Sequence, residues 1–219
     1  MKTNFLEFVE NILLEALDQT LYMTIIATVL ATIIGFIIAI ILVVTDEKGL
    51  RPNKQINTVL GAIINTVRSF PFIILIVAII PFTRMIVGTS IGVDAALVPL
   101  TIGAAPFIAR VIESALKEVD GGLIEAAKSF GASDFQIIFK VMIKEALPSI
   151  VSGITLSTIS ILGYTAMAGS VGAGGLGAVA LTYGHQRFDT QAMIYTVVTL
   201  IIIVQVIQYL GSLAYKKLS

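Results

Sequence analysis

The sequence predicts an all-α polytopic membrane protein with five transmembrane helices. Of its 219 residues, 57% are apolar and only 13% are charged, whereas a soluble domain has about 45–50% apolar and about 25% charged residues. Leu21 to Val44 is a stretch of 24 residues without a charge, and about 20 apolar residues suffice to cross a bilayer. Four further apolar stretches follow. These observations together place the chain in a membrane.

Charge and rare residues exclude several classes of function. The 14 Lys and Arg balance 14 Asp and Glu, whereas a nucleic-acid binder needs a surplus of cations. There is no cysteine and one histidine, His185, so disulfides, thiolate sites and multi-histidine metal motifs are absent. We therefore expect no nucleic-acid partner, no metal site and no catalytic residues in this chain.

The five spans are expected at about residues 21–44, 58–82, 95–112, 147–167 and 190–215. Residues 1–18 precede them with acids and with apolar residues at helical spacing, which is typical of a short amphipathic helix on the membrane surface. In the first span, Ala31, Gly35 and Ala39 recur every four residues and predict close helix packing. Pro99 and Pro106 imply kinks in the third span.

The distribution of Lys and Arg predicts the orientation of the chain across the membrane. Short cytoplasmic loops retain Lys and Arg. One set of connecting segments, together with the C-terminal tail, holds nine cations: Lys48, Arg51, Lys54, Lys117, Lys128, Lys140, Lys144, Lys216 and Lys217. The opposite side has only Lys2, Arg84 and Arg187. We therefore expect the N-terminus outside and the C-terminus inside.

The segment from Glu118 to Pro148 is the only long stretch that is neither a span nor a simple turn. Its first part, Gly122 to Phe130, has a helical composition, with Asp120 as a candidate N-cap and Gly131 as a left-handed residue after the helix. Ser133 and Gln136 form a capping box that opens a second helix, which is expected to end at Pro148. A helix of about ten residues is marginal alone in water, so the first must be held by packing. Its acidic residue, its small residues and its glycine end suit insertion into a groove of another protein.

This segment resembles the EAA loop of ABC-importer permeases. Glu125, Ala126 and Ala127 are followed, after three residues, by Gly131 and then by a run to Leu147 and Pro148. Lys144 stands where the family motif has a proline, which makes the second helix more continuous. The resemblance implies a coupling loop at about residues 117–146 that docks into an ATPase subunit, with these coupling residues: Gly122, Glu125, Ala126, Ala127 and Gly131.

The resemblance extends over nearly the whole chain. Segments that include LYMTIIATVLAT, VRSFPFIIL, VPLTIGAAPFIARVIE and GYTAMAGSVGAGGLGAVA look like the permease subunits of methionine ABC importers, within the type I importer permeases. This implies a permease domain at residues 17–210 of a multi-pass protein in the cytoplasmic (inner) membrane of a bacterium. The implied partners are a second copy in a homodimer, two cytoplasmic ATPase subunits that bind ATP and Mg²⁺, and an external substrate-binding protein or lipoprotein. No cofactor is expected on this chain.

The fourth span has a polar and glycine stripe. Its members recur every three or four residues and therefore share one helix face: Ser149, Gly153, Ser157, Ser160, Tyr164 and Met167. From the residues alone, a tight helix seam and the wall of a translocation path are about equally favoured. The resemblance favours the path, with Ser157, Ser160 and Tyr164 lining it and Met167 as an apolar, flexible gate on the outer side.

Other features favour plainer interpretations. Gly172, Gly174 and Gly177 match G-x-G-x-x-G without a preceding strand, so we expect a flexible outer loop rather than a dinucleotide site. His185 is expected to be a solvated residue of that loop. Arg110 and Glu113 are expected to pair within one helix, and Arg68 fits either positioning of the second span or contact with substrate.

Three alternatives to methionine import remain at this point. A related amino-acid ABC importer would share the coupling loop. An ion-coupled secondary transporter would need acids within its spans, and none lies well inside the apolar stretches. A membrane-embedded enzyme would need a catalytic constellation such as a triad, which the sequence lacks.

Overall fold

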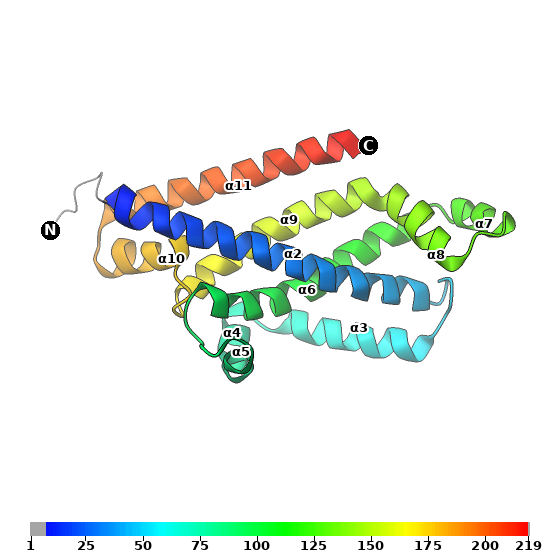
Figure 1. Ribbon diagram of the computed structural model, residues 1–219, viewed down its shortest axis with the longest axis horizontal. Helices are drawn as coiled ribbons and strands as arrows, with labels where there is room; N and C mark the ends of the chain where they lie inside the picture. Colours follow the sequence, from blue (N-terminus) through cyan, green and yellow to red (C-terminus); the bar gives the residue numbers. More distant parts are fainter. Residues whose placement is uncertain (1–7, 219) are drawn as a thin grey trace.

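The structure, a computed structural model, describes residues 8–218 (Figure 1). Every element in this range is a helix, and those labelled η are π-helical. In chain order the helices are η1 (Val9–Leu13), α2 (Leu14–Thr45), α3 (Lys54–Ser69), α4 (Phe72–Ala78), α5 (Ile80–Val87), α6 (Val93–Lys117), α7 (Gly121–Ser129), α8 (Asp134–Gln136), η2 (Ile137–Met142), α9 (Ile143–Gly169), α10 (Gly175–Val179), η3 (Ala180–Gln186) and α11 (Thr190–Leu218).

The core lies between α2, α6 and α9. The small residues predicted to allow close packing do so: Ala31 and Ala39 are fully buried, and a Cβ added at Gly35 would lie 2.9 Å from the backbone oxygen of Ala105 in α6. Only a residue without a side chain permits this approach of two helix backbones. The closely packed α2 and α6 thus form the centre of the bundle, against which other helices pack.

One end of the bundle gathers the connecting segments that are rich in lysine. Figure 1 shows the end of α2, the start of α3, and α7 and α8 together at this end, with the C-terminal end of α11 pointing the same way. We call it the lysine-rich end and define it by residues 46–54 and 117–144. The N-terminal part of α2, α10 and the start of α11 lie at the opposite end.

The second span is broken at Pro71. Four helical stretches among the described residues are long and apolar enough to cross a membrane, and α3 with α4 makes a fifth although this pair bends by 102°. The break falls at Phe70 and Pro71, which are extended, because proline disfavours a helical conformation in the residue before it. As a result α4 and α5 project from the side of the bundle (Figure 1).

Pro148 does not end a helix, so that expectation was wrong. The helical run is continuous from Asp134 to Gly169, and Pro148 lies inside α9. Ala146 and Ile150, on either side of it, are buried in the core. Burial on both sides offsets the loss of one backbone hydrogen bond, which a proline imposes. Helix α6 also contains prolines, Pro99 and Pro106, inside its bounds.

The N-terminal segment does not form the separate surface helix that the sequence predicts. Residues 1–7 lie outside the described residues, and residues 8–18 run directly into α2. Phe8 and Leu13 pack in a cluster with residues of α10 and α11 rather than forming a separate surface helix.

The expected flexible outer loop is largely helical. After Gly174 the chain forms α10, whose Gly175 N–H donates to Gln19 Oε1 at 2.7 Å and whose Leu176 N–H donates to Thr20 Oγ1 at 2.8 Å. Gly175 and Gly177 are buried because they approach their neighbours more closely than a side chain would allow. His185 is exposed, as expected, but lies in η3.

Candidate functional site

Helix α7 is a separately capped unit at the lysine-rich end. Asp120 accepts from the Gly122 N–H at 2.8 Å, which confirms the predicted N-cap. At the other end the Ala132 N–H donates to the Ala127 carbonyl at 3.0 Å and the Gly131 N–H to the Lys128 carbonyl at 2.9 Å. This pair of bonds is a Schellman motif. Gly131 has φ of 79°, the left-handed conformation predicted for it.

The outward face of α7 is free of contacts with the rest of the protein. Ile124 and Ala127 pack against the core, while Gly122, Glu125 and Ala126 are exposed. Phe130, directly after the helix, is 92% exposed. Coupling residues from the sequence therefore divide into one that anchors the helix, Ala127, and others that face outward or shape its ends.

The segment after α7 is fixed to the end of the first span. The capping box of Ser133 and Gln136 is present, as predicted. Asp134 pairs with Arg51 at 2.5 Å between the carboxylate and Nε. A cavity of about 420 Å³ lies between residues 43–50, the end of α6 and α7. The cavity separates α7 from the end of α2 and the end of α6.

A chain of charges joins α2, α3 and α6 beside α7. Lys117 Nζ lies 2.7 Å from Asp46 Oδ2 and 2.8 Å from Glu113 Oε1. Glu113, 5% exposed, also receives the Arg110 guanidinium at 2.7 Å, which confirms the expected pair within the helix. Arg110 reaches on to Asn65 of α3 at 3.2 Å. The hydrogen bond from Lys117 holds the pKa of Asp46 below its usual value.

The stripe predicted on the fourth span is divided between two faces of α9. Gly153 meets Val111 of α6, and Ser157 is 1% exposed with its hydroxyl donating to the Gly153 carbonyl at 2.7 Å. Tyr164 stacks on Phe72 of α4, with ring centroids 4.3 Å apart. These three residues form helix seams within one copy of the chain.

A neighbouring face of α9 is left uncovered. Met167 is 49% exposed, and Ser160 is partly exposed. A Cβ at Gly163 would meet nothing within 4 Å. We call this the open face of α9 and define it by Ser149, Ser152, Leu156, Ser160, Gly163 and Met167. Sequence reasoning missed Ser152, Leu156 and Gly163 because it counted hydroxyls, whereas the open face mixes polar, apolar and small residues at the same three- and four-residue spacing.

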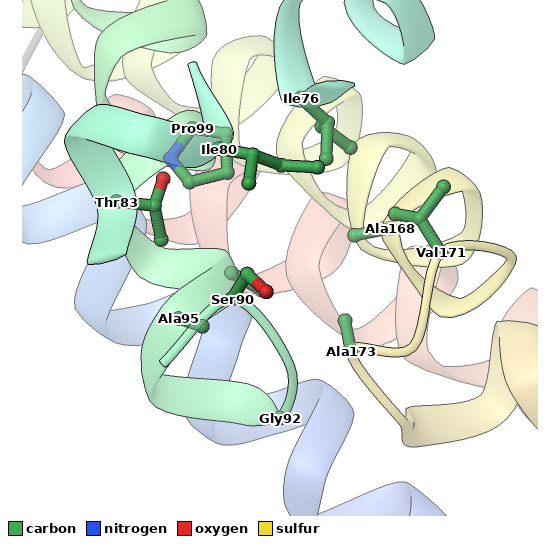
Figure 2. A pocket seen from close by; sticks show the side chains of 11 residues that line it. Ile76, Ile80, Thr83, Ser90, Gly92, Ala95, Pro99, Ala168, Val171 and Ala173 are labelled. Atoms are coloured by element: carbon green, nitrogen blue, oxygen red, sulfur yellow. The ribbon is translucent and has the colours of Figure 1, made fainter. Parts of the chain in front are cut away.

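A small pocket lies between α4, α5, α6 and α9, towards the end of the bundle opposite the lysine-rich end. Figure 2 shows the pocket there, with Ile76, Ile80 and Pro99 on one side and Ala168 and Val171 on the other. Its volume is about 20 Å³, room for roughly one water molecule. A small solute such as an amino acid does not fit in this pocket.

No group of three His, Cys, Asp or Glu side chains within residues 8–218 is arranged to hold a metal ion. The candidate site consists of α7, the charge chain beside it and the open face of α9.

Comparison with known proteins gives consistent similarities. The family described as "binding-protein-dependent transport system inner membrane component" matches residues 31–219. A probable D-methionine transport system permease protein MetI of Vibrio cholerae is 51% identical over 94% of this chain and 92% of its own. The methionine import system permease protein MetP of Bacillus subtilis is 52% identical over 90% and 89%.

A solved structure agrees with these sequence relatives. A chain of the MetNI methionine ABC transporter in an inward-facing conformation has a TM-score of 0.94 with 44% identity, covering 95% of this chain and 96% of that one. The similarity extends over almost the full length of both chains.

Proposed function

The chain belongs to the family of binding-protein-dependent transport system inner membrane components, and on that premise we propose that it is the membrane-spanning permease subunit of an ATP-driven methionine importer. The observation that carries the proposal is near full-length similarity, above 50% identity, to permeases named for methionine transport. The likeness to an inward-facing methionine ABC transporter supports it independently.

The lysine-rich end faces the cytoplasm in this proposal. Retention of lysine and arginine in short cytoplasmic loops supports that orientation, which places the start of α2 outside and the end of α11 inside. The outward face of α7, with Glu125, Ala126 and the exposed Phe130, then docks into a cytoplasmic ATPase subunit that binds ATP and Mg²⁺. An external binding protein delivers substrate to the opposite end.

Two copies of the chain form the translocation path. The open face of α9 is the surface that each copy contributes, and a twofold axis would bring the same face from both copies together. Ser160 and Met167 lie on it. Ser157 and Tyr164 are occupied in seams within one copy, so we leave them out of the path in this conformation. The nearly closed pocket of Figure 2 suits an outer gate that is shut.

Radiolabelled methionine uptake by the reconstituted complex tests this function. We expect uptake into liposomes that requires the ATPase subunit, the external binding protein and ATP, and that continues after proton and sodium gradients are collapsed. Uptake driven by an ion gradient without ATP would instead indicate a secondary transporter. Stronger uptake of another amino acid, in competition with methionine, would indicate a related amino-acid importer.

A further inference from the structure

An open depression between α3, α6 and α9 includes residues to which the sections above give no role, among them Arg68 and Phe107. Its volume is about 490 Å³, and residues from α3, α6 and α9 surround it: Arg68, Phe107, Arg110, Val111, Ser114, Ala115, Glu118 and Ser149. This volume holds a small molecule, in contrast to the closed pocket at the other end.

The cavity opens on the path side of the protein. Ser149 belongs both to its wall and to the open face of α9. If two copies meet around that face, as the proposed function requires, the cavity lies beside the shared path and not against lipid. Ionisable groups of membrane helices are favoured in such water-filled places.

Its two arginines differ in how they are held. Arg110 is fixed, since Glu113 and Asn65 both bind its guanidinium. The Arg68 side chain, in contrast, is exposed and has no hydrogen-bond or ion-pair partner within residues 8–218. A structural arginine in a membrane helix is expected to be paired. The Arg68 guanidinium is thus available for a ligand, and a guanidinium binds a carboxylate through two parallel hydrogen bonds.

We propose that Arg68 binds the α-carboxylate of the amino acid during its passage. This inference rests on the proposed function and adds a substrate contact to it. Phe107 and Val111 present apolar surface for an uncharged side chain. Ser114 and Ser149 add hydroxyls to the lining, and Glu118 adds a carboxylate.

The absence of cysteine allows a direct test of occupancy. Ser114→Cys places one thiol in the cavity, and its labelling by a maleimide is measured in the complete complex in liposomes. L-Methionine is expected to slow the labelling of this thiol. L-Methioninamide, which lacks the carboxylate, is expected to leave the labelling rate unchanged. Ser212→Cys, exposed on α11 outside the cavity, is the control thiol, whose labelling methionine should leave unchanged.

Removal of the guanidinium tests the residue itself. In the Ser114→Cys background, Arg68→Gln is expected to abolish the protection of the thiol by methionine. In the otherwise native chain, Arg68→Gln is expected to lower the maximal uptake rate about tenfold, which corresponds to the loss of one charge-assisted hydrogen bond. The half-saturating concentration should change little, because the external protein captures the substrate. Arg68→Lys should retain part of the rate. Arg84→Gln removes an exposed arginine elsewhere and should leave the rate unchanged.

The outcomes separate this inference from the proposed function. Normal uptake together with undiminished protection in the Arg68→Gln background overturns the carboxylate site alone, whereas failure of the native complex to take up methionine overturns the function. If labelling of the Ser114→Cys thiol depends on phosphatidylglycerol in the liposomes and not on methionine, Arg68 binds a lipid headgroup. If Arg68→Gln disrupts dimerisation but methionine still protects the thiol, Arg68 belongs to the dimer interface. Either result also overturns the inference.

Discussion

Glu113 is a buried carboxylate that holds two cations in place. It is 5% exposed, yet it binds both Arg110 and Lys117. Glu113→Gln removes the charge and keeps the size, so two cations remain close together without their shared counter-charge. Because breaking a buried ion pair is costly and both partners are partly solvated, we expect the free energy of unfolding to fall by about 1–3 kcal/mol.

Thermal or denaturant unfolding of the purified protein in detergent measures this effect. Glu47→Gln is the matched control, since Glu47 is exposed at the same end and should tolerate the change. Equal stability of both variants would show that Glu113 contributes nothing beyond its surface neighbour.

Asp46 makes part of this stability depend on pH. The Lys117 hydrogen bond lowers the pKa of Asp46 from its usual 3.8, so the folded state binds the proton less readily than the unfolded chain. The contribution is complete above pH about 4–5 and is lost as the pH falls through the lowered pKa. The difference in melting temperature between the native chain and Asp46→Asn should therefore be constant near neutrality and disappear in strong acid. A difference that grows on acidification would contradict this pairing.

Met167 is the gate residue of the proposed path. It is 49% exposed on the open face, beside Ala168 of the closed pocket. Met167→Ala shortens an apolar, flexible side chain, so passive leak of methionine through the complex without ATP should rise several-fold while assembly is unchanged. Liposome efflux measures the leak, and Met85→Ala, an exposed methionine on α5, serves as control. Native leak in Met167→Ala would remove the gating role.

At the scale of elements, α7 depends on its glycine end. Gly131 has φ of 79°, which costs a residue with a Cβ about 1 kcal/mol. Gly131→Val should fray the Schellman motif and lower ATP-driven uptake through poorer docking. Gly121→Ala is the control, because a Cβ there meets nothing within 4 Å and its φ is not positive. Co-purification of the ATPase subunit and uptake rate are the measurements, and equal behaviour of the two variants would contradict the role of this cap.

The ends of α7 also show why some elements are predictable from sequence. Asp120, Gly131, Ser133 and Gln136 act on backbone groups within a few residues of themselves, so their short-range signals predict the structure correctly. The continuation of the helix through Pro148 depends instead on the burial of Ala146 and Ile150 by helices that are distant in the sequence. Local rules could not include that contribution.

At the scale of the whole molecule, the open face of α9 predicts a symmetric dimer. The chain has no cysteine, so Gly163→Cys provides a single thiol on this face. Close to a twofold axis the two thiols of a dimer would meet, and mild oxidation should yield a cross-linked dimer on a non-reducing gel. Ile33→Cys, 54% exposed on α2, should remain monomeric under the same conditions. Cross-linking through Ile33 and not Gly163 would place the interface on α2.

The sequence by itself determined the membrane class, the five apolar stretches, the packing role of Ala31 and Gly35, and the caps of α7. Each follows from composition or from contacts spaced three or four residues apart. Only the tertiary structure decided which face of α9 stays uncovered and that the glycine-rich segment is hydrogen-bonded to α2. It also decided that Arg68 has no hydrogen-bond or ion-pair partner within residues 8–218, whereas Arg110 has several. These depend on which helices meet, because a helix presents several similar faces and its neighbours alone select the one that remains exposed.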